Sequence, residues 1–152
     1  MQDPRLETAV LGLHILAAAC WFAPRLFWPK RIRSALASSE AAKVVVPAIA
    51  REMNFTTVSA LVTIGTGVAI IFMHGGMKAV PKTIHMGLTL ALVAFFAGLA
   101  LSLPALVKIR AAVERGALGE AQPHVKKLVI GAMIEHTCWL ATLVTMVWHP
   151  LS

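Results

Sequence analysis

Several ionisable side chains lie inside apolar segments of this sequence, where they are costly unless they have a partner or a task. His14, His85 and the adjacent pair Glu135 and His136 are of this kind. A neutral imidazole can bind a metal through one ring nitrogen while the other nitrogen is held by a hydrogen bond. A carboxyl group in such surroundings is either protonated or paired with a cation. These residue types therefore favour metal ligation or proton transfer.

Four long apolar segments carry these side chains, at about residues 8–28, 55–73, 84–107 and 128–148. Each is close to the ~20 residues that a helix needs to cross ~30 Å of hydrocarbon. The composition agrees, because 58% of the 152 residues are hydrophobic and only 14% are charged. Backbone polar groups find no water in a bilayer, so the segments must be helices. The sequence predicts an all-α integral membrane protein: one domain, residues 1–152, forming an up-down-up-down four-helix transmembrane bundle.

Basic residues gather in the two segments that connect the first helix to the second and the third to the fourth, at about 30–52 and 108–127. They are Lys30, Arg31, Arg33, Lys43, Arg51, Lys108, Arg110, Arg115, Lys126 and Lys127. The positive-inside rule then predicts two cytoplasmic loops, with both termini periplasmic in a bacterial inner membrane. The first loop is expected to extend the first helix, break near Pro47 and lead into the second. The net charge of +7 is assigned to anionic lipid and not to nucleic acid.

The start of the chain lacks the basic-then-apolar layout of a signal peptide, so the first apolar segment is expected to remain as a helix. Two tryptophans, Trp28 and Trp148, lie where aromatic belts form and are predicted to anchor the opposite interfaces.

In this orientation four histidines gather at the outer face, one from each helix: His14, His74, His85 and His149. His136 precedes His149 by ~20 Å along its helix and is therefore deeper. Imidazoles from facing helices are how a membrane bundle holds b-type haem, because the iron takes axial nitrogen ligands and the porphyrin takes an apolar slot.

His14 and His85 are the predicted haem pair, with small residues nearby that leave room for the macrocycle. Trp21 stands seven residues after His14 on the same helix face and could pack against a ring edge. His136 could serve a second haem. The alternative is that His14 and His85 bond across helices with no cofactor. Copper is the other metal considered, since seven methionines accompany the histidines, although methionine in an apolar helix usually serves packing.

Glu135 requires a partner or a proton. Arg25 could be that partner if the two lie at similar depth, or it could extend to the inner surface beside Lys30. A protonated Glu135 next to His136 would form an element of a proton relay. A helix–helix hydrogen bond is the other interpretation of this carboxyl group.

The first helix is also similar to a known family. Its residues Leu13-His14-Ile15-Leu16-Ala17, Trp21-Phe22-Ala23 and Pro29-Lys30 align without gaps with the first-helix pattern LHI…WFAGLFYLPRLF of the HemJ-type protoporphyrinogen oxidases. The wider superfamily includes CopD-like copper-resistance membrane proteins, whose first helices begin with a similar LH…W pattern. Weaker similarities are found at Arg51, His85, Glu135 and the chain end, Val147-Trp148-His149-Pro150.

The resemblance implies a haem b protein of the membrane that oxidises protoporphyrinogen IX and passes electrons to the respiratory chain. By position it implies that His14 is the haem ligand and that His85 and Glu135 are site residues. The chain departs from the pattern at Gly87, where the family has a lysine, and at Ile134 and Thr137, where it has asparagine and proline. Losing the lysine favours haem binding over the oxidase activity.

Two functions of different class therefore remain. The first is a b-type haem protein for electron transfer or porphyrinogen oxidation, with Glu135 as the acid/base group of the enzymatic form. The second is a copper-handling protein or a cofactor-free accessory subunit of a membrane complex. The bilayer is the expected surrounding, respiratory-chain components are the expected partners, and a homo-oligomer is compatible with so small a bundle.

Overall fold

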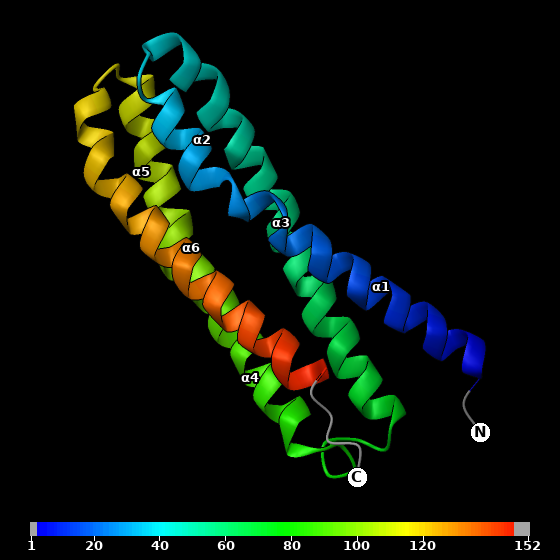
Figure 1. The fold of residues 1–152 in the computed structure, drawn as a ribbon. Coiled ribbons are helices and arrows are strands. Elements are labelled where there is room, and N and C mark those ends of the chain that lie inside the picture. Colours follow the sequence, from blue (N-terminus) through cyan, green and yellow to red (C-terminus); the bar gives the residue numbers. More distant parts are fainter. Residues whose placement is uncertain (1–2, 148–152) are drawn as a thin grey trace.

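The computed structural model describes residues 3–147, which form four long helical rods (Figure 1). In chain order the elements are α1 (Pro4–Phe22), the short 3-10 helix η1 (Pro24–Leu26), α2 (Trp28–Ala35), α3 (Ser39–Met73), α4 (Lys82–Ala97), the π-helical turn η2 (Gly98–Ser102), α5 (Leu103–Glu114) and α6 (Leu118–Val147). Trp148, His149 and the chain end that resembles the family pattern lie outside the described residues.

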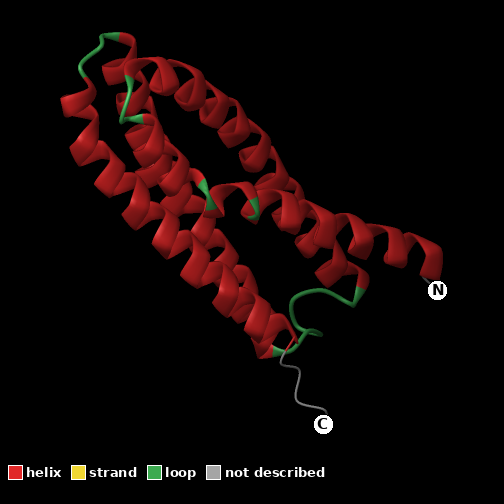
Figure 2. Ribbon diagram, turned by 45° about the horizontal axis from the view of Figure 1, so that its top comes forward, coloured by secondary structure: helices red, strands yellow, loops and turns green. Residues whose placement is uncertain are grey.

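The rods run up, down, up and down in chain order (Figures 1 and 2). All four, Pro4–Ala35, Ser39–Met73, Lys82–Glu114 and Leu118–Val147, are long and apolar enough to cross a membrane. The predicted all-α four-helix bundle of a multi-pass membrane protein is therefore confirmed. At 30 to 35 residues each, the rods are about 45–50 Å long, so they extend beyond the ~30 Å of hydrocarbon.

The predicted helical extension after the first apolar segment is present as α2, but the loop bounds of 30–52 and 108–127 are wrong, because both basic segments are mostly helical. The chain leaves helix only at residues 36–38 in the first segment and 115–117 in the second. Pro47 does not break the chain but lies inside α3. Proline removes the hydrogen bond to the carbonyl four residues earlier, and here that residue, Lys43, is exposed, so water can bond its carbonyl. Pro123 likewise lies inside α6.

Local sequence sets the helix ends. Ser38 caps α3 by accepting from the backbone N–H of Ala41 at 3.1 Å, which satisfies one of the free N–H groups of the first turn. Gly116 has a φ of 74°, a left-handed conformation that glycine adopts without a steric penalty. It allows the short reversal between α5 and α6 that brings these two helices together.

The basic ends of the rods form a tightly packed four-helix bundle of their own. Its buried core is drawn from α2, α3, α5 and α6 and includes Trp28, Ile32, Val46, Ile49, Leu106, Ile109, Val125 and Leu128. The spacing of Val46, Ile49 and Met53 is that of one helix face, which explains why these segments fold as helices although they are not continuously apolar. Lys43, Lys108 and Arg110 remain exposed on the outside.

The opposite half is more open. There α1 packs against α3 and α4 packs against α6, and the two pairs diverge toward the N-terminus (Figures 1 and 2). A smaller buried cluster of Trp21, Phe22, Ala60 and Ala94 joins them midway along the molecule. Large apolar side chains such as Ile15 and Phe72 are exposed, as lipid-facing residues are. This half contains His14 and His85.

Candidate functional site

A buried ion pair lies near the middle of the molecule. Arg25 Nη1 donates to Glu135 Oε2, and the two residues are 4% and 1% exposed. Ser102 Oγ donates to the other carboxylate oxygen of Glu135 at 2.6 Å. Arg25 Nε donates to Thr56 Oγ1 at 3.1 Å. Each charge is thus compensated, as a buried charge must be, and the network joins four segments of the chain.

The break in the first rod places Arg25. Pro24 has no N–H to give to the carbonyl of Cys20, and α1 ends at Phe22 before the three-residue η1 begins. This short turn directs the Arg25 side chain into the interior of the bundle and not toward the inner surface of the membrane. The pairing of Arg25 with Glu135 is therefore confirmed, and the interpretation of Arg25 as a surface-reaching residue is wrong.

The π-helical turn and two glycines provide the space for the ion pair. Within η2 the N–H of Leu103 donates to the carbonyl of Gly98, five residues back, and Pro104 has no N–H for the carbonyl of Ala100. A Cβ on Gly98 would stand 2.9 Å from Arg25 Nη1, and one on Gly131 would stand 2.6 Å from Ser102 Oγ. Both glycines are therefore required by the close approach of the helices to this network.

A second ion pair connects this centre to the surface. The Arg25 guanidinium lies 5.3 Å from the ring centroid of Trp28, within the range of a cation–π contact. Trp28 Nε1 donates to Glu52 Oε2 at 2.8 Å, and Arg31 Nη1 donates to both oxygens of Glu52 at 2.8 and 2.7 Å. Trp28 is buried, so its predicted role as an interface anchor is wrong, because its ring packs on Arg25 inside the bundle.

His14 is held against α3. Its Nδ1 lies 2.9 Å from the carbonyl oxygen of Thr63 and 3.1 Å from Thr66 Oγ1. A carbonyl only accepts, so Nδ1 carries the proton, which leaves Nε2 of the neutral ring as the free nitrogen. A Cβ on Gly67 would stand 3.1 Å from His14 Cε1, so glycine is what lets the ring lie this close to α3.

His85 lies on α4 and makes a different contact. Its Nε2 donates to the carbonyl oxygen of Met77 at 2.7 Å, in the connection between α3 and α4. The helices α1 and α4 belong to the two separate pairs that diverge in this half (Figures 1 and 2). His14 and His85 therefore lie on helices of different pairs, and their joint ligation of one haem stays a prediction. His74 lies at the same end, exposed, with Nε2 3.3 Å from Glu7 Oε1.

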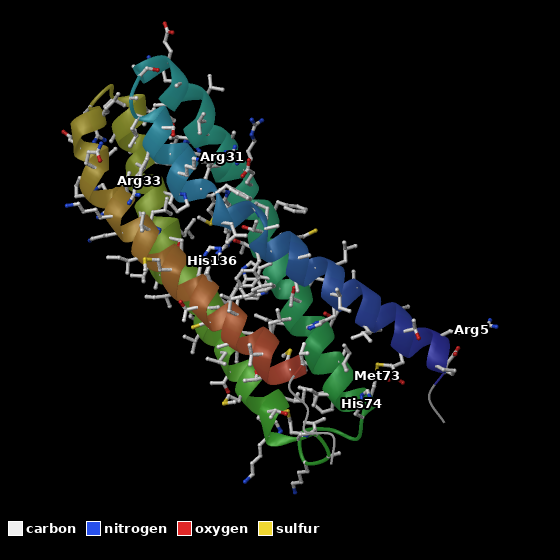
Figure 3. The ribbon with its side chains drawn as sticks, viewed as in Figure 1. Arg5, Arg31, Arg33, Met73, His74 and His136 are labelled. Carbon is white, nitrogen blue, oxygen red and sulfur yellow. The ribbon has the colours of Figure 1, made fainter. Side chains whose placement is uncertain are left out.

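His136 points into the interior between α6 and the broken first rod (Figure 3). Its Nδ1 donates to the carbonyl of Ala132, and its ring lies edge-on to Phe22 with 6.0 Å between centroids. Its Nε2 is buried without a hydrogen-bond partner among the described residues. Trp21 is 2% exposed, packs on Phe95 at 6.5 Å, and also buries its Nε1 without a partner there.

Comparison with known proteins identifies no relative of this chain. The chain matches no protein-family model, no curated protein and no solved structure. Within residues 3–147, no three His, Cys, Asp or Glu side chains gather as a metal-binding group would.

The sequence indicated the charged members of these sites but missed their polar partners. Thr56, Thr63, Thr66 and Ser102 lie in apolar helices, where hydroxyl groups usually bond the carbonyl one turn earlier. Thr56, Thr63 and Thr66 do so as well, and this common habit gives no sign of a second role. The single available signal was depth, because Ser102 and Thr56 occur at the level of Arg25 and Glu135.

Adding a methyl group beside the ion pair should destabilise the fold. We expect Gly131→Ala to lower the free energy of unfolding by about 1–3 kcal/mol, because Ser102 and the backbone behind it cannot yield easily. Gly12→Ala is the matched control, since a Cβ there meets nothing within 4 Å and should be neutral or slightly stabilising. Unfolding in mixed detergent micelles, followed by circular dichroism, measures both, and equal stability of the two variants would contradict this account of η2.

Proposed function

We propose that this protein binds haem b in the membrane and transfers electrons, with His14 as an axial ligand. The observation that supports the proposal is the hydrogen bonding of His14. A haem- or metal-ligating histidine characteristically gives its second N–H to a backbone carbonyl or a carboxylate, which fixes the ring and makes the other nitrogen a better ligand. The contact of His14 Nδ1 with the Thr63 carbonyl has this form.

Small residues surround His14. Ala17 and Ala18 lie on the next turn of α1, and Gly67 lies on α3 against the imidazole ring. When bound, haem supplies a one-electron redox centre whose potential depends on the axial ligand and its hydrogen bonds. The protein's part is to orient His14 through Thr63 and Thr66, to exclude water with apolar side chains, and to support the site from Trp21, two turns away.

His85 and His136 are the candidates for further ligation. His85 would have to give up its bond to Met77 to present Nε2. His136 repeats the arrangement of His14, with Nδ1 bonded to a carbonyl and Nε2 free. It contacts Phe22, which lies eight residues, or ~12 Å along the helix axis, from His14. His136 therefore fits a second haem better than the first.

Electron transfer accounts for Glu135 better than porphyrinogen oxidation does. A general acid or base must reach the substrate, but Glu135 is buried and both its oxygens are bonded, to Arg25 and Ser102. We therefore infer that Glu135 is a positioning residue of the bundle. Respiratory-chain components of the same membrane are the partners that such an electron carrier would serve.

The alternative is a cofactor-free accessory subunit. It is favoured by one observation: the bonds from His14 to Thr63 and Thr66 also satisfy this side chain as a plain contact between α1 and α3. A copper-handling protein is the third candidate. In its copper(I) form it would be colourless, like a cofactor-free subunit, so a measurement of metal content is needed to distinguish these two.

A reduced-minus-oxidised absorption spectrum of the detergent-purified protein, made in cells well supplied with haem, tests the proposal. We expect a b-type spectrum in the wild type and its loss in His14→Ala. Thr63→Ser should keep the spectrum, because the bond to His14 comes from the backbone carbonyl of residue 63. His74→Ala is the matched control, because His74 lies at the same end but is exposed; it should retain the spectrum. His85→Ala and His136→Ala show whether either is the second ligand. A colourless wild-type protein would refute haem binding.

We further propose that the basic ends of the rods face the cytoplasm of a bacterial cell and that both termini are periplasmic. Ten Lys and Arg side chains lie in residues 30–52 and 108–127 at the packed end, while Arg5, Lys78 and Lys82 are the basic residues near the other, and such asymmetry sets orientation. Alkaline phosphatase fused to the C-terminus should then be active and green fluorescent protein dark. The same fusions in the turn at residues 115–117 should give the reverse, and a fluorescent C-terminal fusion would contradict the orientation.

A further inference from the structure

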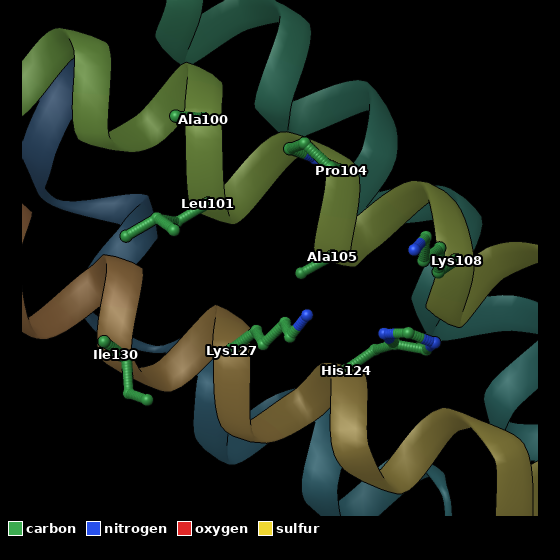
Figure 4. Close-up of a pocket in the computed structure, with 8 residues that line it drawn as sticks. All are labelled: Ala100, Leu101, Pro104, Ala105, Lys108, His124, Lys127 and Ile130. Atoms are coloured by element: carbon green, nitrogen blue, oxygen red, sulfur yellow. The ribbon is translucent and has the colours of Figure 1, made fainter.

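A groove on the surface combines an apolar floor with a basic end. It lies between α5 and α6, has a volume of about 210 Å³, and is lined by Ala100, Leu101, Pro104, Ala105, Lys108, His124, Lys127 and Ile130. Figure 4 shows Lys108, His124 and Lys127 gathered at one end and Ala100, Leu101 and Ile130 toward the other. The lining contains no carboxylate, so nothing within the groove neutralises the two lysines.

The bounds of the apolar segments predict that the groove crosses the edge of the hydrocarbon. Lys108 directly follows the apolar segment that ends at Val107, and Lys127 directly precedes the one that begins at Leu128. From Lys108 to Leu101 the helix runs ~10 Å toward the membrane centre. The basic end is therefore at the level of lipid headgroups, and the apolar floor is at the level of the first acyl carbons.

His124 adds a polar group without a partner. Its Nδ1 is buried and has no hydrogen-bond partner in the described part of the chain, and its ring lies between α5 and α6 facing Lys108 (Figure 4). A buried polar atom left unpaired is costly, so a ligand that bonds it gains affinity. The turn η2 contributes Ala100 and Leu101, and Pro104 follows it, so the same helix irregularity that admits the ion pair on its inner side shapes this groove on its outer side.

We propose that this groove binds one molecule of an anionic phospholipid from the bilayer. The phosphate would lie between Lys108 and Lys127 within reach of His124, and an acyl chain would follow Leu101 and Ile130. The charge complementarity, the apolar continuation and the depth together match a phospholipid, whereas a free anion would use only the basic end. Basic pockets between helices on the positively charged side of a membrane protein are suited to acidic lipids.

Native mass spectrometry of the full chain, titrated with phosphatidylglycerol or phosphatidylcholine of identical acyl chains, tests the proposal. We expect tighter binding of phosphatidylglycerol, with the affinity reduced about thirtyfold in Lys108→Gln/Lys127→Gln. The matched control is Lys43→Gln/Lys126→Gln, which removes the same charge from exposed lysines at the same end of the molecule but outside the groove; it should bind as the wild type does. Ile130→Trp should weaken lipid binding without changing any charge.

Three results would overturn the proposal. One is equal affinity for the two lipids. Another is an equal loss in both double variants, which would mean diffuse surface charge. The third is competition by millimolar inorganic phosphate together with an unaffected Ile130→Trp, which would mean an anion site with no lipid specificity. All exchanged residues are exposed, so the variants should unfold at the same temperature as the wild type, and a loss of lipid binding is then not a loss of folding. The test measures lipid binding alone, so its outcome does not depend on whether the protein binds haem.

Discussion

The ion pair of Arg25 and Glu135 is the interaction around which the other irregularities of this bundle are arranged. Two charges removed from water cost several kcal/mol each unless they are paired and their remaining bonding capacity is met. Here Ser102 and Thr56 meet that capacity, and both come from different helices. The broken first rod, the π-helical turn and the glycines at 98 and 131 all serve to bring these groups within bonding distance.

The ion pair lies at the boundary between two halves of the bundle that are packed differently. On one side, the basic ends of the helices pack side chains such as Ile49 and Ile109 as a water-soluble bundle does. On the other, two helix pairs diverge and leave large apolar side chains such as Ile15 and Phe72 exposed. Because the ion pair and its two hydroxyl partners come from all four rods, we infer that it fixes how the rods are aligned.

The sequence was sufficient for the class of fold because continuous apolar segments have few solutions in a bilayer. It was insufficient for the boundaries. The helical spacing of Val46 and Ile49 was obscured by charges and by Pro47, so a break was expected where α3 continues without interruption. The pairing of Arg25 with Glu135 could be anticipated from depth and charge. The turn that makes it possible depends on Pro24, and a proline at this position is equally compatible with an Arg25 side chain that extends to the inner surface of the membrane.

The candidate haem site shows the same limit. Sequence spacing placed His14 and His85 at similar depth but could not show which helices are neighbours. The structure pairs α1 with α3, so the backbone carbonyl of Thr63 and the hydroxyl of Thr66 are the partners of His14. If His14 holds a haem, the helix that orients its ring also leads down to Thr56 and the ion pair, which gives the proposed cofactor site a rigid base.

A double-mutant cycle on the ion pair tests this account most directly. Arg25→Met and Glu135→Leu should each lower the free energy of unfolding by about 3–5 kcal/mol, because each leaves one buried charge unpaired. The double variant should lose far less than the sum of the two, giving a coupling energy of more than about 2 kcal/mol. The exposed pair of Arg110 and Glu114 is the control and should couple by about 0.3–0.5 kcal/mol. Additive losses at Arg25 and Glu135 would show that the bundle does not depend on their pairing.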